Sequence, residues 1–181
     1  FKSVNMQYDS KNKLFDSLTV KFQKGEFWAI CGATGSGKTT ILDLISGIIE
    51  PVSGHILYDR INSRDIKLDS LHQRIGYLTQ NSFIFAGSIL ENIYWGHENP
   101  DISKLDQVLQ LSQLDDLARE KTLNFPISEN GQNLSGGEQQ RIAIARILLK
   151  SSDFILMDEP SSALDLKTER KFLSALGALK G

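Results

Sequence analysis

The stretch "GATGSGKT", residues 32–39, decides the fold of this chain. It matches the phosphate-binding pattern G-x-x-x-x-G-K-[ST] completely and lies between a predicted strand and a predicted helix. Glycines let the backbone curl so that successive N–H groups face phosphate oxygens, and the helix that follows presents its positive end to the same anion. The sequence therefore predicts a phosphate cradle between a buried strand over residues 26–31 and a helix that includes residues 41–45.

Two side chains of this cradle carry the expected chemistry. Lys38 can reach the β- and γ-phosphates of a nucleotide, and the Thr39 hydroxyl can ligate Mg²⁺. The alternative is a glycine-rich turn followed by a chance Lys-Thr pair, but the strand and helix patterns on both sides favour the cradle. Cys31 ends the apolar run "EFWAIC" and is expected to pack in the strand rather than to react.

The stretch "FILMDEP", residues 154–160, predicts an apolar strand that ends in two carboxylates. Asp158, at the carboxyl end of the strand, is well placed to hold a water molecule of Mg²⁺. Glu159 points in a different direction and could orient or deprotonate an attacking water. Taken alone, a polar strand end that turns at Pro160 is the simpler explanation. The cradle upstream favours a catalytic pair instead.

The stretch "LSGGEQQRIAIARILL", residues 134–149, predicts a long helix with two glycines in its first turn. Each glycine costs about 1 kcal/mol relative to alanine inside a helix. Ser135 and Glu138 have the spacing of a capping box. That motif does not explain Gly136 and Gly137, because the first helical positions tolerate ordinary residues. Two missing Cβ atoms are explained if another surface approaches the helix backbone closely.

The order of predicted elements indicates an α/β fold with an inserted helical part. We expect a P-loop NTPase core, with a mixed, mainly parallel sheet and helices, plus an N-terminal antiparallel β region and an inserted α-helical subdomain. The expected segments are a nucleotide-binding core over residues 1–80, a helical subdomain over 81–150 and a return to the core over 151–181. Strands are expected at residues 1–8, 18–22, 26–31, 74–79 and 153–158, and another strand just after a turn at 51–54. Helices are expected at residues 88–95, 103–110 and 114–121, from residue 135, and after residue 165. A polar loop is expected at residues 124–133.

Composition narrows the function classes. The chain has 181 residues, of which 40% are hydrophobic, and this suits one globular domain with a real core. Lys and Arg are scattered and the net charge is −2, so nothing marks a nucleic-acid surface or a basic membrane-binding helix. A single cysteine excludes an internal disulfide. No apolar run approaches the roughly 18 residues needed to cross a bilayer.

Together these motifs resemble those of the nucleotide-binding domain of ABC transporters. "GATGSGKTT" resembles the Walker A motif, "FILMDEP" the Walker B motif and "SALD", residues 162–165, the D-loop. "LSGGEQQR" resembles the family's signature motif, which is far more specific than a P-loop. The matches run in the family's order, so the resemblance covers essentially the whole chain.

The resemblance also implies roles for three residues that have simpler explanations. Tyr8 lies where the family stacks an aromatic ring on adenine, although it could be a strand residue that packs on its neighbours. Gln80 lies where the family senses Mg²⁺ and water, although it could simply end a strand. Asp165 lies at the family's dimer interface and could also be a helix N-cap. The expected site consists of Glu159, Gln80 and Lys38 for catalysis, Thr39, Gln80 and Asp158 for the metal, and Tyr8, Gly32, Ala33, Thr34, Gly35, Ser36, Gly37, Lys38, Thr39, Thr40, Ser135, Gly136, Gly137 and Asp165 for the nucleotide.

The resemblance implies ATP and Mg²⁺ as cofactors and two kinds of protein partner. In ABC dimers the signature helix of one subunit points at the γ-phosphate held by the P-loop of the other. The second partner is a transmembrane domain, fused upstream, which places this domain at the cytoplasmic face of a membrane. Residues 80–93 look like the exporter type, in which they meet coupling helices of the membrane domain. Glu138, where glutamine is commoner, and Pro160, where exporters more often carry alanine, depart from that subtype.

The expected function is an ATPase that powers transport through ATP-dependent dimerisation. The family carries a switch histidine beyond the position of Gly181, so slow turnover is expected from the chain as given. One alternative is a non-transport ABC-type ATPase that acts on nucleic acid or ribosomes, but such chains carry coiled-coil insertions or basic linkers. Another is a regulatory module without hydrolysis, which the Asp158–Glu159 pair disfavours.

Overall fold

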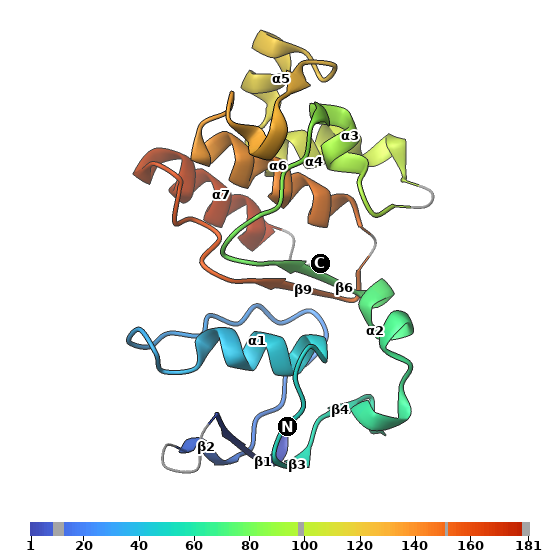
Figure 1. Cartoon of the computed structure of the whole chain (residues 1–181), viewed down its shortest axis with the longest axis vertical. Helices are drawn as coiled ribbons and strands as arrows, with labels where there is room; N and C mark the ends of the chain where they lie inside the picture. The colour runs from blue at the N-terminus through green and yellow to red at the C-terminus, as the bar shows by residue number, and fades with distance from the viewer. Residues whose placement is uncertain (9–12, 98–99, 151, 179–181) are drawn as a thin grey trace. The chain divides into compact units, whose positions relative to one another are not determined.

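The computed structural model describes residues 1–8, 13–97, 100–150 and 152–178 of the chain. These residues form two compact units, Phe1–Ile75 and Gly76–Gly181, which we call unit 1 and unit 2 (Figure 1). The expected division at residues 80 and 150 concerns functional segments and stays a prediction. Each unit is considered by itself below.

Unit 1 contains the antiparallel β region that the sequence predicts. Strand β1 (Lys2–Gln7) pairs antiparallel with β2 (Lys13–Leu18) on one side and with β3 (Ser53–His55) on the other. Helix α1 packs on this sheet, because Val4, Leu44 and Ile56 form one buried cluster (Figure 1). The remaining elements of the unit are α1 (Lys38–Ser46), β4 (Leu57–Tyr58), β5 (Ile61–Asn62), the 3-10 turn Ser63–Asp65 and α2 (Leu68–Arg74).

Two strand predictions in unit 1 are wrong. Residues 18–22 follow β2 instead of forming a strand, apart from Leu18 itself. Residues 26–31 form no strand, and Cys31 is exposed rather than packed. A β-strand is stabilised by hydrogen bonds to a neighbouring strand, and apolar composition does not supply that neighbour. Trp28 instead meets Phe22 edge to face, with ring centroids 5.2 Å apart.

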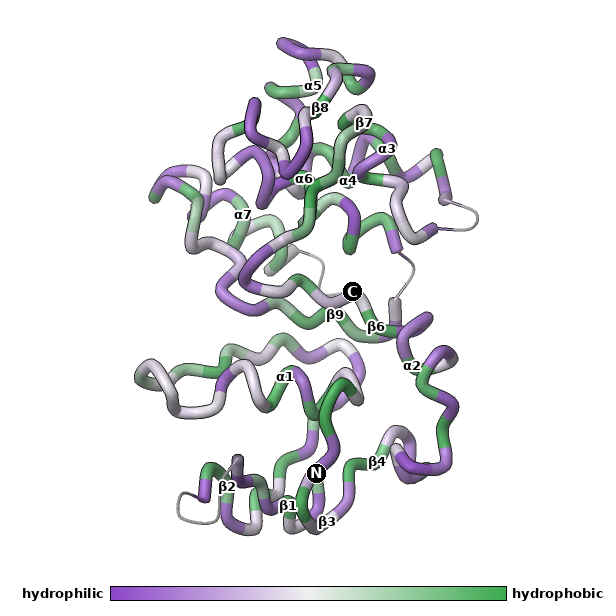
Figure 2. Tube along the Cα trace, in the orientation of Figure 1, coloured by the Kyte–Doolittle hydropathy of each residue, from purple (hydrophilic) through white to green (hydrophobic). Residues whose placement is uncertain are grey.

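Unit 2 joins a two-stranded sheet to a group of helices. Strand β6 (Ile75–Leu78), whose first residue is the last of unit 1, pairs with β9 (Phe154–Met157), and both strands are largely apolar (Figure 2). Strand β7 (Gly87–Ser88) pairs antiparallel with β8 (Pro126–Ile127). The helices are α3 (Ile89–Tyr94), α4 (Leu105–Leu111), α5 (Asp115–Lys121), α6 (Gly136–Leu149) and α7 (Leu166–Ala178), with 3-10 turns at Ile102–Lys104 and Glu129–Gly131.

Helix α6 is the central element of unit 2. One of its faces, with Ile142, belongs to a buried cluster shared with α3, α4 and α5. Another face, with Ile144 and Ile147, packs with Leu78 of β6 and Phe172 of α7. A helix that is apolar on two faces lies between two layers rather than on a surface. The signature segment is therefore anchored on both sides.

The helices of unit 2 lie close to the positions that the sequence predicts. The expected helices at residues 88–95, 103–110 and 114–121 correspond to α3, to the 3-10 turn with α4, and to α5. The expected loop at 124–133 also contains the short strand β8 and a 3-10 turn. Strand β8 forms because β7 offers it a partner, which a pattern of polar residues does not reveal.

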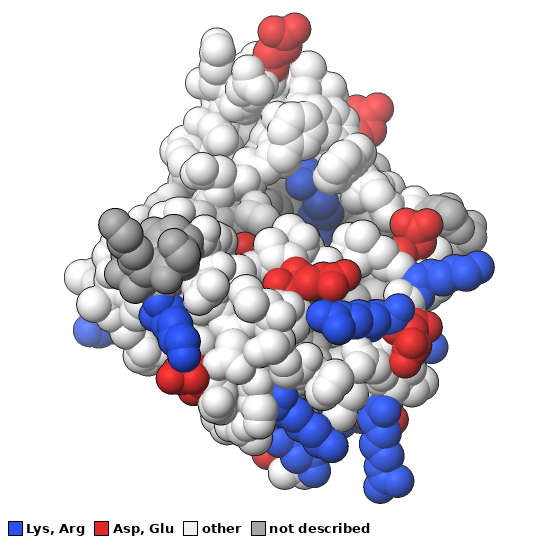
Figure 3. Space-filling model, turned by 60° about the horizontal axis from the view of Figure 1, so that its bottom comes forward, with Lys and Arg blue, Asp and Glu red and all other residues white. Residues whose placement is uncertain are grey.

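Two further observations concern the hydropathy of the helices and the charge of the surface. Across the described ranges, which omit residues 9–12, 98–99, 151 and 179–181, no helix has the length and apolar character needed to span a bilayer. On the face drawn in Figure 3, acidic and basic side chains are interspersed rather than separated by sign.

Candidate nucleotide site

The phosphate cradle of unit 1 has the expected turn and helix. A turn closes where the Ser36 N–H donates to the Ala33 carbonyl at 3.1 Å, and α1 begins directly after Gly37. The Lys38 ammonium donates to the carbonyls of Gly32 and Ala33 at 3.0 and 3.1 Å. The loop therefore wraps around the end of the lysine side chain, at the N-terminus of α1, where an anion is favoured.

The cradle depends on glycine at two positions. Gly37 has φ 92°, and a Cβ there would lie 2.7 Å from the ring of Phe15. A Cβ on Gly32 would lie 2.5 Å from Oγ of Ser36. At Gly37 a larger residue would be strained by both the positive φ and the ring, whereas at Gly32 the Ser36 side chain would have to move. The loop suits an anion, because its charged lysine and its helix N-terminus both attract negative charge.

Unit 1 also brings Tyr8 to the start of α1. The Tyr8 hydroxyl lies 3.0 Å from Oγ1 of Thr40, while the tyrosine remains 69% exposed. Tyr8 follows the last residue of β1, and its exposure rules out simple packing against strand neighbours. A tethered, exposed ring is available to stack on a planar ligand. The expected residues gathered in unit 1 are Tyr8, Gly32, Ala33, Thr34, Gly35, Ser36, Gly37, Lys38, Thr39 and Thr40.

Unit 2 brings together Gln80, Asp158 and Glu159, whereas Thr39, the other residue expected at the metal, lies in unit 1. Asp158 follows β9, is 7% exposed, and donates its backbone N–H to the Leu78 carbonyl of β6 at 2.8 Å. Because β6 and β9 are neighbours, Gln80 lies near the end of β9. Its Nε2 donates to Oε2 of Glu159 at 3.0 Å. Gln80 and Glu159, 79 positions apart in sequence, therefore meet side chain to side chain.

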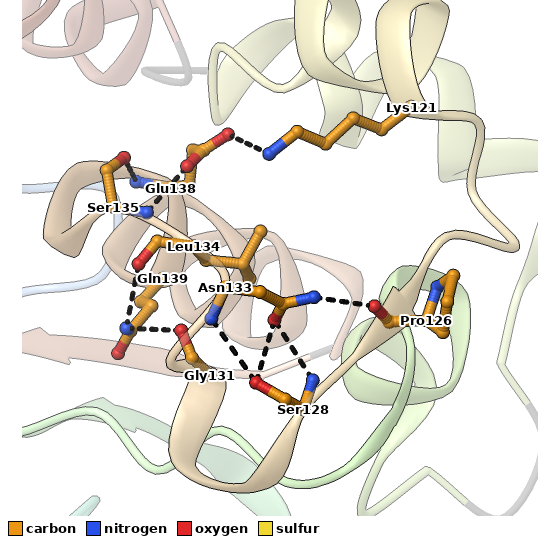
Figure 4. Close-up of polar contacts among 9 residues, drawn as sticks. All are labelled: Lys121, Pro126, Ser128, Gly131, Asn133, Leu134, Ser135, Glu138 and Gln139. Carbon is orange, nitrogen blue, oxygen red and sulfur yellow. Dashed lines mark hydrogen bonds and ion pairs between the residues drawn. The ribbon is translucent and has the colours of Figure 1, made fainter.

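The signature helix begins with the predicted capping box (Figure 4). Oγ of Ser135 accepts from the Glu138 backbone N–H at 3.2 Å, and a Glu138 carboxylate oxygen accepts from the Ser135 N–H at 2.6 Å. The other oxygen of this carboxylate accepts from the Lys121 ammonium of α5 at 2.9 Å. Because Ser135 Oγ is the acceptor in the cap, its own O–H can donate elsewhere.

The loop before the signature helix is also held by side-chain amides (Figure 4). Asn133 donates to the carbonyl of Pro126 at 2.9 Å and accepts from the Ser128 N–H at 3.0 Å. Gln139 donates to the carbonyls of Gly131 at 2.9 Å and Leu134 at 3.3 Å. These hydrogen bonds fix the conformation of the loop from which α6 begins.

The absence of a side chain at Gly136 and at Gly137 has different structural explanations. A Cβ on Gly137 would lie 3.0 Å from the Ala163 carbonyl oxygen, so this glycine lets a loop of its own chain approach. A Cβ on Gly136 would meet only the Ala163 Cβ, at 3.7 Å, which is an ordinary contact. The described residues thus account for Gly137 and leave the bare position of Gly136 unexplained.

Asp165 begins α7 as the predicted N-cap. Its Oδ1 accepts from the backbone N–H groups of Lys167 at 2.9 Å and Thr168 at 3.1 Å, and its Oδ2 accepts from the Thr168 hydroxyl. The hydrogen bonds from the Thr168 hydroxyl and backbone N–H hold the pKa of Asp165 below its usual value. The structural role of this residue is confirmed, whereas its expected role in a dimer stays a prediction.

Two residues, one beside the signature and one within it, were not singled out from the sequence. Lys121 pairs with Glu138 across 17 positions, and the charge of each residue alone gives no indication of that pairing. Gln140 is 6% exposed and contacts the loop after β9. A usable signal existed for Gln140, because Ala143, Ile144 and Ile147 lie three, four and seven positions further on. Those spacings place a polar residue on an apolar helix face.

The chain is similar to known proteins along almost its entire length. The family model described as ABC transporter matches residues 15–162. An ATP-dependent lipid A-core flippase of Neisseria gonorrhoeae is 37% identical over 182 residues, which is 99% of this chain and 29% of the relative. A β-(1→2)glucan export ATP-binding/permease protein of Bartonella quintana is 35% identical over 181 residues, or 99% of this chain and 30% of that protein.

A solved structure shares the fold. The structure of a bacterial Atm1-family ABC exporter with ATP bound matches with a TM-score of 0.91 and 32% identity, over 99% of this chain and 32% of that one. These relatives are thus about three times as long as the chain. The P-loop NTPase fold expected from the sequence is confirmed, together with its helical insertion. The chain belongs to the ABC transporter family and is an ATPase domain of that family.

Proposed function

We propose that the chain binds and hydrolyses ATP between two head-to-tail copies, and that this cycle powers transport across a membrane. The observation that carries the proposal is Gly136, at the tip of the capped helix α6. Its missing Cβ has no cause among the described residues of its own chain, whereas a phosphate approaching from a second P-loop would need that space. The partner copy is identical or closely related.

The residues of unit 1 would hold the nucleotide. Tyr8 offers an exposed ring for the adenine, and Lys38 exchanges its contacts with the carbonyls of Gly32 and Ala33 for phosphate oxygens. Thr39 of unit 1 offers a hydroxyl oxygen, and Gln80 and Asp158 of unit 2 offer amide and carboxylate oxygens. These are oxygen types that Mg²⁺ prefers, and Mg²⁺, when bound, would neutralise phosphate charge.

Glu159 would act as the base that prepares water for attack. Gln80 donates to Oε2 of this carboxylate, so Oε1 is left to accept a proton from water. The tip of α6 from the second copy adds the Ser135 hydroxyl and backbone N–H groups as donors to the γ-phosphate. Hydrolysis removes the contacts to that phosphate and the pair opens, which is a closure switch driven by phosphate contacts.

The transport role draws on the relatives and on one surface. The two named relatives are a flippase and an export ATP-binding/permease protein, both much longer than this chain. In unit 2, the rings of Phe83, Phe85 and Trp95 lie with centroids 5.8 to 6.3 Å apart, and Phe83 and Trp95 are more than half exposed. We infer that this aromatic cluster receives a membrane domain at the cytoplasmic face of the membrane.

Gly136→Asp tests the pairing step. An acidic residue in the first turn suits the helix dipole, so the separate copy should be as stable as the parent. The same carboxylate would repel the phosphates of a facing copy. In a Glu159→Gln background, where slow hydrolysis holds the closed state, ATP should produce a dimer in sedimentation measurements, and Gly136→Asp should abolish it. Nucleotide affinity of the separate copy should stay unchanged.

Two controls sharpen this test. Gly177→Asp adds the same charge on α7, where a Cβ meets nothing within 4 Å, and it should leave the dimer intact. Gly136→Ala adds only a methyl group and should weaken pairing by size alone. Undiminished dimer formation by Gly136→Asp would remove the signature tip from the proposed site.

A further inference from the structure

One buried side chain of α6 holds the loop that carries Glu159. Gln140 is 6% exposed. Its Nε2 donates to the Glu159 backbone carbonyl at 3.1 Å and to the Ser162 hydroxyl oxygen at 3.4 Å. Its Oε1 accepts from the Ala163 N–H at 3.1 Å. Both ends of the amide are used, and all three partners lie within residues 159–163.

The backbone that Gln140 holds has an uncommon conformation. Glu159 has φ 48°, in the left-handed region. Residues other than glycine rarely adopt this strained conformation, and they keep it only where surrounding contacts impose it. The Ser162 N–H donates to the same Glu159 carbonyl at 3.1 Å, but this bond lies inside the loop. Gln140 supplies the restraint from another element.

The helix and this loop also touch through their backbones. The Cα of Gly137 lies so close to the Ala163 carbonyl that a Cβ would be 3.0 Å from its oxygen. Beside this contact a polar pocket of about 210 Å³ is lined by Gln80, Gln140 and Ser162 among others. Gln80 is the residue that holds the Glu159 carboxylate, so both restraints on Glu159 border one pocket.

We propose that Gln140 is a positioning residue for hydrolysis. By holding the Glu159 backbone, Gln140 sets the direction in which the Glu159 side chain points. The inference rests on the proposed function, in which Glu159 is the base and the tip of α6 closes on a triphosphate. Gln140 lies four residues after Gly136 on the same helix, so any displacement of the tip on closure reaches the Glu159 carbonyl through one rigid turn and one amide. Closure and base placement are linked within one copy.

Two substitutions in the full-length protein separate this role from packing. Gln140→Met keeps the length of the side chain and loses all three hydrogen bonds. Gln140→Glu keeps the acceptor for the Ala163 N–H and loses the donor to the Glu159 carbonyl. Asn92→Asp is the matched control, because Asn92 is also a buried amide of unit 2 that donates to the Phe85 carbonyl and accepts from the Phe85 N–H.

Both Gln140 variants should lower kcat by about tenfold or more while the affinity for ATP changes by less than about twofold. ATP-driven pairing in the Glu159→Gln background should persist. Hydrogen exchange at the Ala163 amide should accelerate in Gln140→Met, since its acceptor is gone. Asn92→Asp should lower the melting temperature without this loss of kcat.

A Gln140→Met variant with the parental kcat would overturn the inference, as would an equal loss of kcat in Asn92→Asp. The unsubstituted protein reports on the proposed function separately. If the parent hydrolyses ATP without pairing, the head-to-tail proposal fails while the kcat ratio still decides the role of Gln140. If the parent does not hydrolyse ATP, both proposals fail.

Discussion

Glu138 shows how one side chain serves both a helix and its neighbour. Burial opposes ionisation of this carboxyl, but hydrogen bonds from the Ser135 backbone and the Lys121 ammonium outweigh burial and lower its pKa. The carboxylate is 15% exposed and lies close to the helix tip that would face a phosphate. Lys121 therefore compensates a negative charge that the proposed site would otherwise present to its ligand.

The pH dependence of stability tests this pairing. A carboxyl whose pKa is lower in the folded state stabilises the fold above its unfolded pKa, ordinarily 4.5 for glutamate, and loses that contribution as pH falls through the folded pKa. Glu138→Gln should therefore cost about 1 kcal/mol at pH 7 and nearly nothing in strong acid. Urea unfolding across this range measures the difference.

Glu120→Gln serves as the residue-scale control. Glu120 is exposed on α5, and its replacement should change the free energy of unfolding by less than about 0.5 kcal/mol at any pH. A Glu138→Gln deficit that stays constant from neutral pH to strong acid would contradict the ionised pair.

At the scale of elements, two helices of unit 2 begin in the same way. Ser88 caps α3 and Ser135 caps α6, and each accepts from the backbone N–H of a glutamate three positions later, which completes a capping box. The two caps are chemically equivalent, yet only the tip of α6 carries the bare Gly136. Comparison of the two helices therefore separates the stability of a cap from its proposed role toward phosphate.

Alanine at either cap should destabilise the chain similarly. Ser88→Ala and Ser135→Ala should each cost about 1 kcal/mol in chemical denaturation, because each leaves one backbone N–H, of Glu91 or of Glu138, without its acceptor. Only Ser135→Ala should also weaken ATP-driven pairing, since it removes a donor proposed to reach the γ-phosphate. Equal pairing by both variants would limit Ser135 to its cap.

At the scale of the whole molecule, the proposed site is shared between copies. The P-loop lies in unit 1 of one copy and the signature tip in unit 2 of another, so a pair contains two equivalent sites. Each site then takes its P-loop from one copy and its signature tip from the other copy, so a substitution in either motif disables a site that is shared by two copies. This geometry distinguishes a head-to-tail pair from two sites that are each complete within one chain.

Mixing two inactive variants tests that geometry. Lys38→Ala removes the phosphate contact and Gly136→Asp removes the closing tip, so each variant alone should be inactive. Because neither variant should pair with itself, the pairs in an equal mixture are mixed ones, and each has one intact site of two. The mixture should therefore regain up to about half of the parental ATPase rate. The enzymatic rate is measured against total protein. A rate no greater than that of the separate variants would argue for sites within single chains.

Local chemistry could be predicted from the sequence because it depends on residues a few positions apart. The P-loop turn, the capped start of α6 and the N-cap of α7 follow from such spacing, and they lie where they were expected. The strand expected over residues 26–31 failed for the opposite reason, since a strand requires a partner that its own residues do not specify. Apolar composition was an incomplete guide there.

The amino-acid sequence by itself determined the family, the cradle and the signature helix. Only the tertiary structure decided that Gly137 accommodates its own chain while Gly136 stays open, and that Gln140 reaches the backbone of Glu159. Those contacts join segments separated by many positions, and their distances depend on how helices and loops pack. Spacing along the chain sets dihedral angles and caps, whereas packing sets which distant groups can touch.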